Sequence, residues 1–310
     1  MSEKRLLRII VGPTAVGKTD YSIGEAIQWG SPVISCDSRQ IYKEMSIGTA
    51  VPSAAQLAAV RHYFIQTCPV TELYTAGQYE VDALQLIRSL FDQGHDVLVM
   101  AGGSGFYVDA LCNGLEETPP TDLKLRAALM ARLASEGLPA LAEELRRLDP
   151  EAVSRMDVSN PQRVVRALEV CMASGRPFSS FKPSAPKKRD FAIEKIGLRR
   201  SREVLYDRID RRVLQMMEEG LLEEVRSLLP YRDLPALRTV GYRELFDWID
   251  VEQGRIPGGG MAAATAGEAP RKIPSSLDEA VSLIQQHTRN YAKRQMTWWR
   301  RDPDIHWIDL

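Results

Sequence analysis

Short apolar runs alternate along this chain with longer stretches in which apolar residues recur at helical spacing. Three of the runs, LLRIIVGP, PVISCDS and DVLVMAGGSG, each end at a polar or glycine-rich turn. A fourth run, IEKIGL, ends at Leu198. Apolar runs of this length between helical stretches are typical of parallel strands buried under helices. We therefore predict an α/β fold in which a parallel sheet is flanked by helices, with active groups at the carboxyl ends of the strands.

A long stretch of the chain, from Thr121 to about Ala173, shows helical spacing with no strand pattern. We interpret residues 121–189 as an all-helical insertion in a discontinuous core made of residues 1–120 and 190–310. One helix of the insertion has clear ends, because Asn160 is a good N-cap, Pro161 suits the first position and Gly175 follows the last turn.

The C-terminal part of the chain combines a loop and a helix. Residues 254–276 are rich in Gly and Pro and poor in large apolar side chains, so we expect a mobile surface loop there. A helix is predicted from Asp278 to about Trp299, with Arg289 and Lys293 on its outward face.

The first predicted strand runs into a glycine-rich loop, IIVGPTAVGKTD, which a helix-like segment follows. This order and the pattern G-x-x-x-x-G-K-[ST] are typical of a phosphate-binding loop. Its backbone N–H groups and the positive helix start bind an anionic group, and we expect Lys18 to reach a terminal phosphate and Thr19 to coordinate Mg²⁺. The residues predicted to bind phosphate are Gly12, Pro13, Thr14, Ala15, Val16, Gly17, Lys18 and Thr19.

Asp37 ends the second predicted strand, near the phosphate loop if the sheet is parallel. It could coordinate Mg²⁺, accept a proton from an incoming nucleophile, or only cap the next helix. The turn that it begins, DSRQIY, also offers a hydroxyl, a guanidinium and an amide that suit hydrogen bonds to a base or a sugar. Ser104, after the third strand, places a hydroxyl and backbone amides at the same edge.

Basic residues gather in two segments although the formal charge of the chain is −1. Residues 182–212 carry eleven Lys or Arg against five Asp or Glu, and residues 287–301 carry five basic residues and no acid. Arg208 or Arg212 could stabilise negative charge on a departing phosphate, and a solvated helix face explains their spacing equally well. The composition excludes a globally basic nucleic-acid binder and leaves room for a local basic surface.

Composition also bears on compartment. No apolar run approaches 18 residues, so we expect no membrane span. The four cysteines are scattered, without a C-x-x-C pair, and we interpret them as core thiols in a reducing compartment. The chain of 310 residues has the balance of apolar and charged residues of a soluble globular enzyme, and we expect it in the cytoplasm.

An ordered set of motifs resembles the tRNA dimethylallyltransferase (tRNA isopentenyltransferase) family. The motifs are GPTAVGKT, SCDSRQIYKEMSIGTAVP, AGGSGFYVDAL, NPQRVVRALEV, RTVGYREL and TRNYAKRQMTWWRR. The resemblance covers nearly the whole chain and lacks only the loop 254–276. It implies a P-loop NTPase-like core that transfers a dimethylallyl group from dimethylallyl diphosphate to N6 of adenine 37 in tRNA, with Mg²⁺, and releases diphosphate.

The same resemblance implies roles for individual residues. Asp37 matches the general base, while Lys18, Thr19 and Arg208 match positions that act on the diphosphate. The expected partner is the anticodon stem-loop of a tRNA with adenines at 36 to 38, and we expect the protein to act as a monomer. The residues expected to contact tRNA are Asp37, Ser38, Arg39, Gln40, Ser104, Arg126, Gln162, Arg163, Val164, Val165, Arg166, Arg289 and Lys293.

Three other classes of protein remain as alternatives. A prenyltransferase for free AMP, ADP or ATP would not need the helical insertion. A P-loop kinase of a small metabolite would turn over ATP and would give the motif AKRQMTWWRR no task. A non-enzymatic RNA-binding module would leave Lys18, Thr19 and Asp37 without a purpose. A tRNA enzyme is expected to lose affinity for RNA steeply as salt rises.

Overall fold

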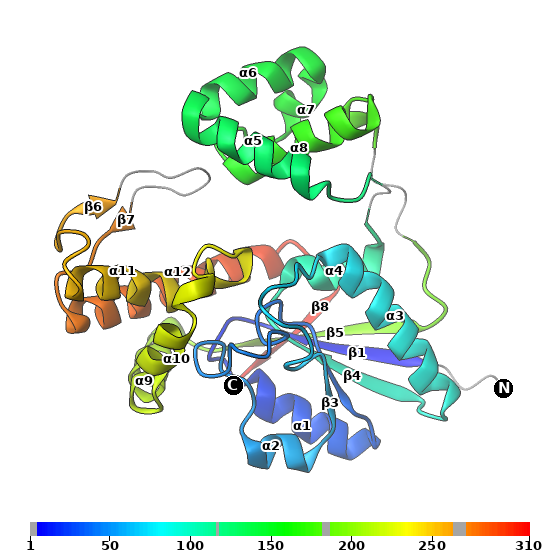
Figure 1. Cartoon of the computed structure of the whole chain (residues 1–310). Coiled ribbons are helices and arrows are strands. Elements are labelled where there is room, and N and C mark those ends of the chain that lie inside the picture. Colours follow the sequence, from blue (N-terminus) through cyan, green and yellow to red (C-terminus); the bar gives the residue numbers. More distant parts are fainter. Residues whose placement is uncertain (1–4, 116–117, 182–186, 263–270) are drawn as a thin grey trace. The chain divides into compact units, whose positions relative to one another are not determined.

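The chain folds into two compact units. The computed structural model describes residues 5–115, 118–181, 187–262 and 271–310 (Figure 1). The first unit, called the sheet unit below, consists of residues 1–114, 187–258 and 274–310. The second, called the helical unit, consists of residues 115–186 and 259–273.

A parallel sheet forms the centre of the sheet unit. Its strand order is β3-β2-β4-β1-β5-β8, and every pairing between neighbours is parallel. The strands are β1 (Leu6–Val11), β2 (Val33–Ser35), β3 (His62–Tyr63), β4 (Val97–Ala101), β5 (Ala192–Arg199) and β8 (Ile305–Asp309). The four apolar runs correspond to β1, β2, β4 and β5, so the predicted parallel sheet is confirmed. The two edge strands, β3 and β8, were not predicted.

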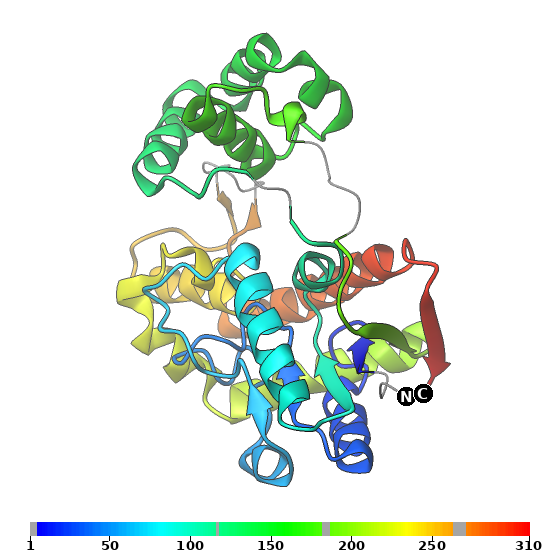
Figure 2. The ribbon, with the colours of Figure 1, turned by 90° about the vertical axis from the view of Figure 1, so that its right-hand side faces the viewer.

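Helices cover both faces of this sheet. The helices of the sheet unit are α1 (Lys18–Trp29), α2 (Ala54–Ala59), α3 (Ala76–Asp92), α4 (Gly105–Asn113), α9 (Arg202–Glu218), α10 (Leu221–Ser227), α11 (Tyr242–Glu252) and α12 (Leu277–Trp299). Val99 of β4 packs in one buried cluster with Ala26 of α1. The next residue, Met100, lies within 3.7 Å of the Tyr79 hydroxyl of α3. Because successive strand residues point to opposite faces, α1 and α3 lie on opposite sides of the sheet (Figures 1 and 2).

A second buried cluster joins α9, α10, α11 and α12 to the loop after β2. Tyr42 and Met45 of the loop pack in it with Leu245 of α11 and Ile284 of α12. Two short 3₁₀ helices, Leu229–Tyr231 and Pro235–Leu237, lie between α10 and α11. Segments far apart in the sequence are therefore fastened together beside the carboxyl ends of the strands.

The helical unit has its own core. It contains α5 (Leu123–Glu136), α6 (Leu138–Leu148), α7 (Pro150–Arg155), α8 (Pro161–Ser174) and the 3₁₀ helix Phe178–Ser180. The Asn160 side chain caps α8 by accepting from the backbone N–H groups of Gln162 and Arg163, and Gly175 ends the helix in the left-handed conformation. The predicted ends of this helix are confirmed.

Val164 and Val165 require a correction. Both were expected to contact tRNA, but both side chains are fully buried (0% exposed) in the core of the helical unit. They face Leu141 and Leu145 of α6 within one cluster, because apolar residues on an amphipathic helix turn toward its partners. In this structure they stabilise the unit and are inaccessible to RNA.

The segment predicted as a loop, 254–276, also differs from the prediction. It contains two short strands, β6 (Met261–Ala262) and β7 (Arg271–Lys272), which pair antiparallel. Residues 263–270 lie outside the described residues. Residues 259–273 group with the helical unit. The larger segment of that unit runs from 115 to 186, whereas the sequence pattern predicted 121–189.

Within the described residues, no helix is long and apolar enough to cross a membrane.

Candidate active site

The loop after β1 has the conformation that an anion-binding turn requires. Gly12 has φ +146°, and a Cβ there would lie 2.6 Å from the Leu198 carbonyl oxygen of β5. Gly17 is the N-cap of α1 with φ +115°, and no side chain caps the first turn of that helix. The first N–H groups of α1 therefore point toward the loop without a side-chain partner, as in phosphate-binding loops.

Lys18 lies folded inside this loop. Its Nζ donates to the carbonyl oxygens of Gly12 at 3.0 Å and Pro13 at 2.8 Å. Burial lowers the pKa of Lys18 to about 8, against the opposing effect of the Asp37 carboxylate. An anion bound among the loop amides would favour the charged ammonium, so a bound phosphate would raise the pKa of Lys18.

Three arginines surround the same loop. Arg208 Nε of α9 donates to the Ala15 carbonyl at 2.8 Å, and Arg200 Nε donates to the Val16 carbonyl at 2.9 Å. Burial, followed by the neighbouring charge of Arg208, lowers the pKa of the Arg212 guanidinium, which lines the cavity. The predicted cation Arg208 therefore lies at the loop, and Arg200 is a further cation that the sequence pattern did not indicate.

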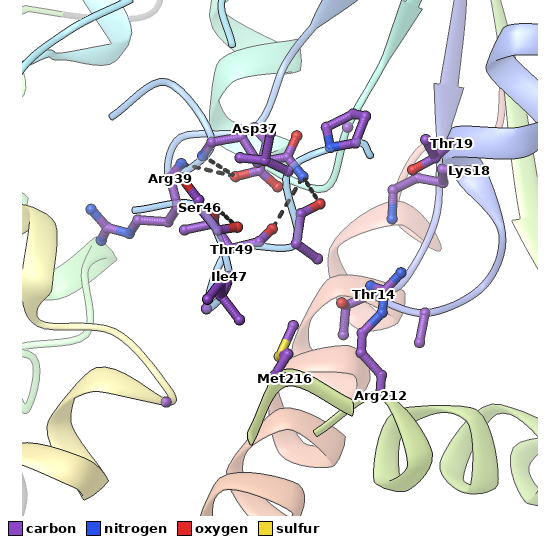
Figure 3. Close-up of a pocket in the computed structure, with 18 of the residues that line it drawn as sticks. Thr14, Lys18, Thr19, Asp37, Arg39, Ser46, Ile47, Thr49, Arg212 and Met216 are labelled. Atoms are coloured by element: carbon purple, nitrogen blue, oxygen red, sulfur yellow. Dashed lines mark hydrogen bonds between the residues drawn. The ribbon is translucent and has the colours of Figure 1, made fainter. Parts of the chain in front are cut away.

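Asp37 begins the turn after β2. Its Oδ1 accepts from the backbone N–H groups of Arg39 at 2.8 Å and Gln40 at 3.3 Å (Figure 3). Residues 38–41 form a turn and no helix, so the carboxylate caps this turn and the interpretation as a helix N-cap is wrong. Both bonds use Oδ1, which leaves Oδ2 able to meet a substrate in the cavity.

The hydroxyl of Ser104, which lies between β4 and α4, holds the Asp37 turn. It accepts from the Ser38 backbone N–H at 2.8 Å and lies 3.0 Å from the Ser38 hydroxyl oxygen. Ser104 was expected to contact a substrate. Its contacts in this structure fix the turn that carries Asp37.

Gln295 of α12 connects the phosphate loop to the turn after β4. Its Oε1 accepts from the Thr14 backbone N–H at 2.8 Å, and its Nε2 donates to the Gly103 carbonyl at 3.0 Å. A Cβ on Gly103 would lie 2.3 Å from that Nε2. Gln295 was not among the residues predicted for the site. Its amide on the buried face of an amphipathic helix could have indicated a role, because buried polar groups are hydrogen-bonded to a partner.

One cavity of about 900 Å³ in the sheet unit is lined by the phosphate loop, the Asp37 turn, α9 and α12. The Asp37 turn and the Lys18–Thr19 end of the phosphate loop lie on different sides of the close-up in Figure 3. Ile47 and Met216 add apolar surface. The arginines that line the cavity are Arg39, Arg208, Arg212, Arg238, Arg243 and Arg294. This excess of cations suits a substrate with several negative charges.

The residues that line the cavity fit Mg²⁺ in one coordination mode. Among the described residues, no group of three or more His, Cys, Asp or Glu side chains could form a protein cage for a metal. Mg²⁺ is usually held by few protein oxygens together with substrate phosphates and waters. The Thr19 hydroxyl and the Asp37 carboxylate both line the cavity and supply such oxygens.

The basic residues expected at a nucleic-acid surface have different environments. In the helical unit, Arg126 and Arg166 both pair with the buried Glu169, and the Gln162 side chain accepts from Arg126 at 3.1 Å. Arg163 is exposed on the same helix.

On α12 of the sheet unit, Arg289 pairs with Asp210 of α9, while Lys293 is exposed. Arg163 and Lys293 are therefore the more accessible cations.

The family model and the most similar relatives indicate the same family for this chain. The family model described as IPP transferase matches residues 40–302. The chain is 44% identical over 302 residues to the tRNA dimethylallyltransferase 1 of Bacteroides thetaiotaomicron, covering 97% of this chain and 91% of that protein. It is 45% identical over 307 residues to the tRNA dimethylallyltransferase 2 of Porphyromonas gingivalis, covering 99% and 95%.

Solved structures agree with the fold. The tRNA isopentenylpyrophosphate transferase of Bacillus halodurans is 34% identical, with a TM-score of 0.66, over 99% of this chain and 90% of that one. A eukaryotic dimethylallyltransferase acting on tRNA is 23% identical, with a TM-score of 0.77, over 98% of this chain and 74% of that one. The eukaryotic likeness supports the fold alone.

Gln295→Ala is expected to weaken binding of inorganic diphosphate with Mg²⁺ by about 10-fold, because it removes two hydrogen bonds that hold the phosphate loop, each worth about 1 kcal/mol. Isothermal titration calorimetry measures the change. Gln286→Ala, an exposed amide on the same helix, is the matched control and is expected to bind like the wild type. Unchanged affinity in Gln295→Ala would contradict a role in shaping the loop.

Arg166→Ala is expected to destabilise the helical unit by about 2–3 kcal/mol, since it removes a hydrogen-bonded partner of the buried Glu169. Arg163→Ala, three residues away and exposed, is expected to have little effect on stability. Hydrogen exchange of peptides from α5 and α8 in the full chain measures local stability. Equal exchange in the two variants would show that Arg166 does not hold Glu169.

Proposed function

This chain belongs to the IPP transferase family, and from that membership we propose that it is a tRNA dimethylallyltransferase. We propose that it transfers a dimethylallyl group from dimethylallyl diphosphate to N6 of adenine 37 in the anticodon loop and releases diphosphate. One observation carries the proposal: the phosphate loop and the Asp37 turn line the same cavity. A group that binds the leaving diphosphate and a group that accepts a proton are therefore available in one place.

In this reaction the adenine N6 attacks C1 of the allylic donor. The new N–C bond forms as the C1–O bond breaks, and the electron pair of that bond leaves with the diphosphate. N6 loses one proton, which Asp37 accepts on Oδ2, because Oδ1 is engaged by the turn. An exocyclic amine is a weak nucleophile, and a positioned base typically accelerates such a step by about 10²–10⁴-fold.

The leaving diphosphate gains negative charge as the bond breaks. The uncapped amides at the start of α1, with Lys18, Arg208 and Arg212, would stabilise that charge. Thr19 would hold Mg²⁺ together with the diphosphate oxygens, and Mg²⁺ would supply further charge neutralisation there. The buried Lys18 gains a proton most readily when the anion is present, because the anion offsets the cost of burial.

The tRNA would contact exposed cations in each unit. Arg163 of the helical unit and Lys293 of the sheet unit are exposed and suit contacts to the phosphates of the anticodon stem-loop. An adenine in a loop can leave its stack at a cost of only a few kcal/mol, which gives N6 access to the cavity. The proposal includes a monomer acting in the cytoplasm, where the four buried free thiols stay reduced.

A product assay tests the function directly. Protein, Mg²⁺ and dimethylallyl diphosphate are incubated separately with unmodified tRNA having adenines at 36 to 38, with AMP and with ATP. We expect one C5H8 unit on the tRNA alone, located at adenine 37 by mass spectrometry of nuclease fragments. Prenylated AMP or ATP beside untouched tRNA would move the chain to the nucleotide prenyltransferases, and ATP hydrolysis without prenylation would favour a kinase.

Asp37→Asn is expected to lower kcat by at least ~10², while tRNA affinity stays within a few-fold. The asparagine Oδ1 can still accept from the two turn amides, so the change removes the base and keeps the turn. Single-turnover kinetics and filter binding measure the two quantities. Asp20→Asn, which neutralises another carboxylate that lines the cavity, serves as the control and is expected to lose less than ~10-fold. A wild-type rate in Asp37→Asn would refute the assignment of the base.

A further inference from the structure

The loop between the Asp37 turn and α2 is held by a carboxylate from a distant helix. The Glu224 side chain of α10 accepts three successive backbone N–H groups: Ser46 at 2.9 Å and Ile47 at 2.7 Å on Oε2, and Gly48 at 3.0 Å on Oε1. Successive amides of this kind form a concave anion-binding nest. Here the anion is part of the protein itself.

Tyr242 of α11 supplies a fourth donor. Its hydroxyl donates to Glu224 Oε1 at 2.6 Å, and its side chain is fully buried. Burial, and then the negative charge of Glu224, raises the pKa of Tyr242 well above its usual range, so the phenol stays a donor. A Cβ on Gly48 would lie 2.6–2.7 Å from the tyrosine ring, which explains the glycine at this position.

The held loop, residues 46–50, also contacts the Asp37 turn. Gln40 Nε2 donates to the carbonyl oxygens of Thr49 at 3.1 Å and Ala50 at 2.8 Å. The Gln40 backbone N–H in turn donates to Asp37 Oδ1. A continuous set of hydrogen bonds therefore runs from Glu224 through the held loop and Gln40 to Asp37.

The same loop forms one wall of the cavity. All five of its residues line the cavity, and Ile47 supplies an apolar side chain there, near Met216 in the view of Figure 3. A hydrocarbon group attached to a diphosphate at the phosphate loop needs such apolar surface, because the rest of the wall is rich in arginine.

We propose that Glu224 is a positioning residue for prenyl transfer: by binding the amides of Ser46, Ile47 and Gly48 it sets the wall that limits the length of the allylic donor and fixes the turn that carries Asp37. The inference rests on the proposed function. Glu224 itself is expected to touch neither substrate. It acts through the backbone of the held loop, where a displacement of about 1 Å can cost roughly 10²-fold in rate.

Glu224→Gln tests the proposal. Glutamine keeps the length of the side chain but offers one acceptor oxygen in place of two, and its NH₂ group faces amide donors. The two variants Glu224→Gln and Glu223→Gln are compared with the wild type. Glu223 is the matched control, since it is the adjacent exposed glutamate on the same helix. Active enzyme is counted by burst titration, so that kcat refers to folded sites only.

The informative readout is selectivity between donors. For each variant, kcat/KM is measured with dimethylallyl diphosphate and with geranyl diphosphate, the ten-carbon homologue, on the same tRNA. We expect Glu224→Gln to lose at least ~10-fold in kcat/KM for the five-carbon donor and to change the ratio between the two donors by at least ~5-fold. Glu223→Gln is expected to match the wild type in both.

A merely structural role predicts a different result. It would lower the fraction of active enzyme and leave kcat, KM and the donor ratio per active site unchanged, which would overturn the inference. If Glu224→Gln does not fold, Tyr242→Phe carries the test, because it removes one donor to Glu224 and keeps the buried ring. It is expected to change the ratio in the same direction by a smaller factor, and an unchanged ratio in it would also overturn the inference.

The outcome for the wild type distinguishes a failure of the proposed function from a failure of the role of Glu224. A wild type that prenylates no tRNA would end the proposed function. If the wild type prenylates tRNA and Glu224→Gln has the same kcat, KM and donor ratio as the wild type, only the role of Glu224 is refuted.

Discussion

The close approach of backbone segments at the carboxyl edge of the sheet is the constraint on which the site depends. A Cβ on Gly102 would lie 2.5 Å from the backbone of Cys36, and one on Gly103 would meet the amide of Gln295 at 2.3 Å. Because neither position has room for a side chain, the ends of β2 and β4 and the inner face of α12 come within hydrogen-bonding reach of one another. The phosphate loop and the Asp37 turn then share one cavity, in which the two proposed substrates, one at each segment, can meet.

Much of this arrangement could be predicted from local patterns. Each strand that carries a site segment is an apolar run followed by a turn, and the phosphate loop has fixed spacing between Gly12 and Thr19. Those signals are short in sequence and need no knowledge of partners. The strands β3 and β8 escaped prediction because two residues at one edge, and a C-terminal strand that starts just past a long helix, give too little pattern to distinguish from a loop.

Features that depend on distant partners could not be predicted. Glu224 lies on a short helix, and its contacts to Ser46 and Gly48 cross more than 170 positions of the chain. The family resemblance implied tRNA contacts for Arg126 and Arg166, but it could not show that the buried Glu169 pairs with both. Periodicity identifies which face a residue occupies, whereas the partner on that face is determined only by the tertiary fold.

The helical unit is assembled from two separate stretches of the chain, residues 115–186 and 259–273. Recombination that exchanged it between related genes would therefore need two coordinated replacements. If the larger stretch alone were moved, it would be combined with the β6 and β7 of the recipient protein and not with its own. The two stretches are expected to be inherited together. Genetic transplantation of this unit is thus a harder step than for an ordinary inserted domain, which a single continuous segment can transfer.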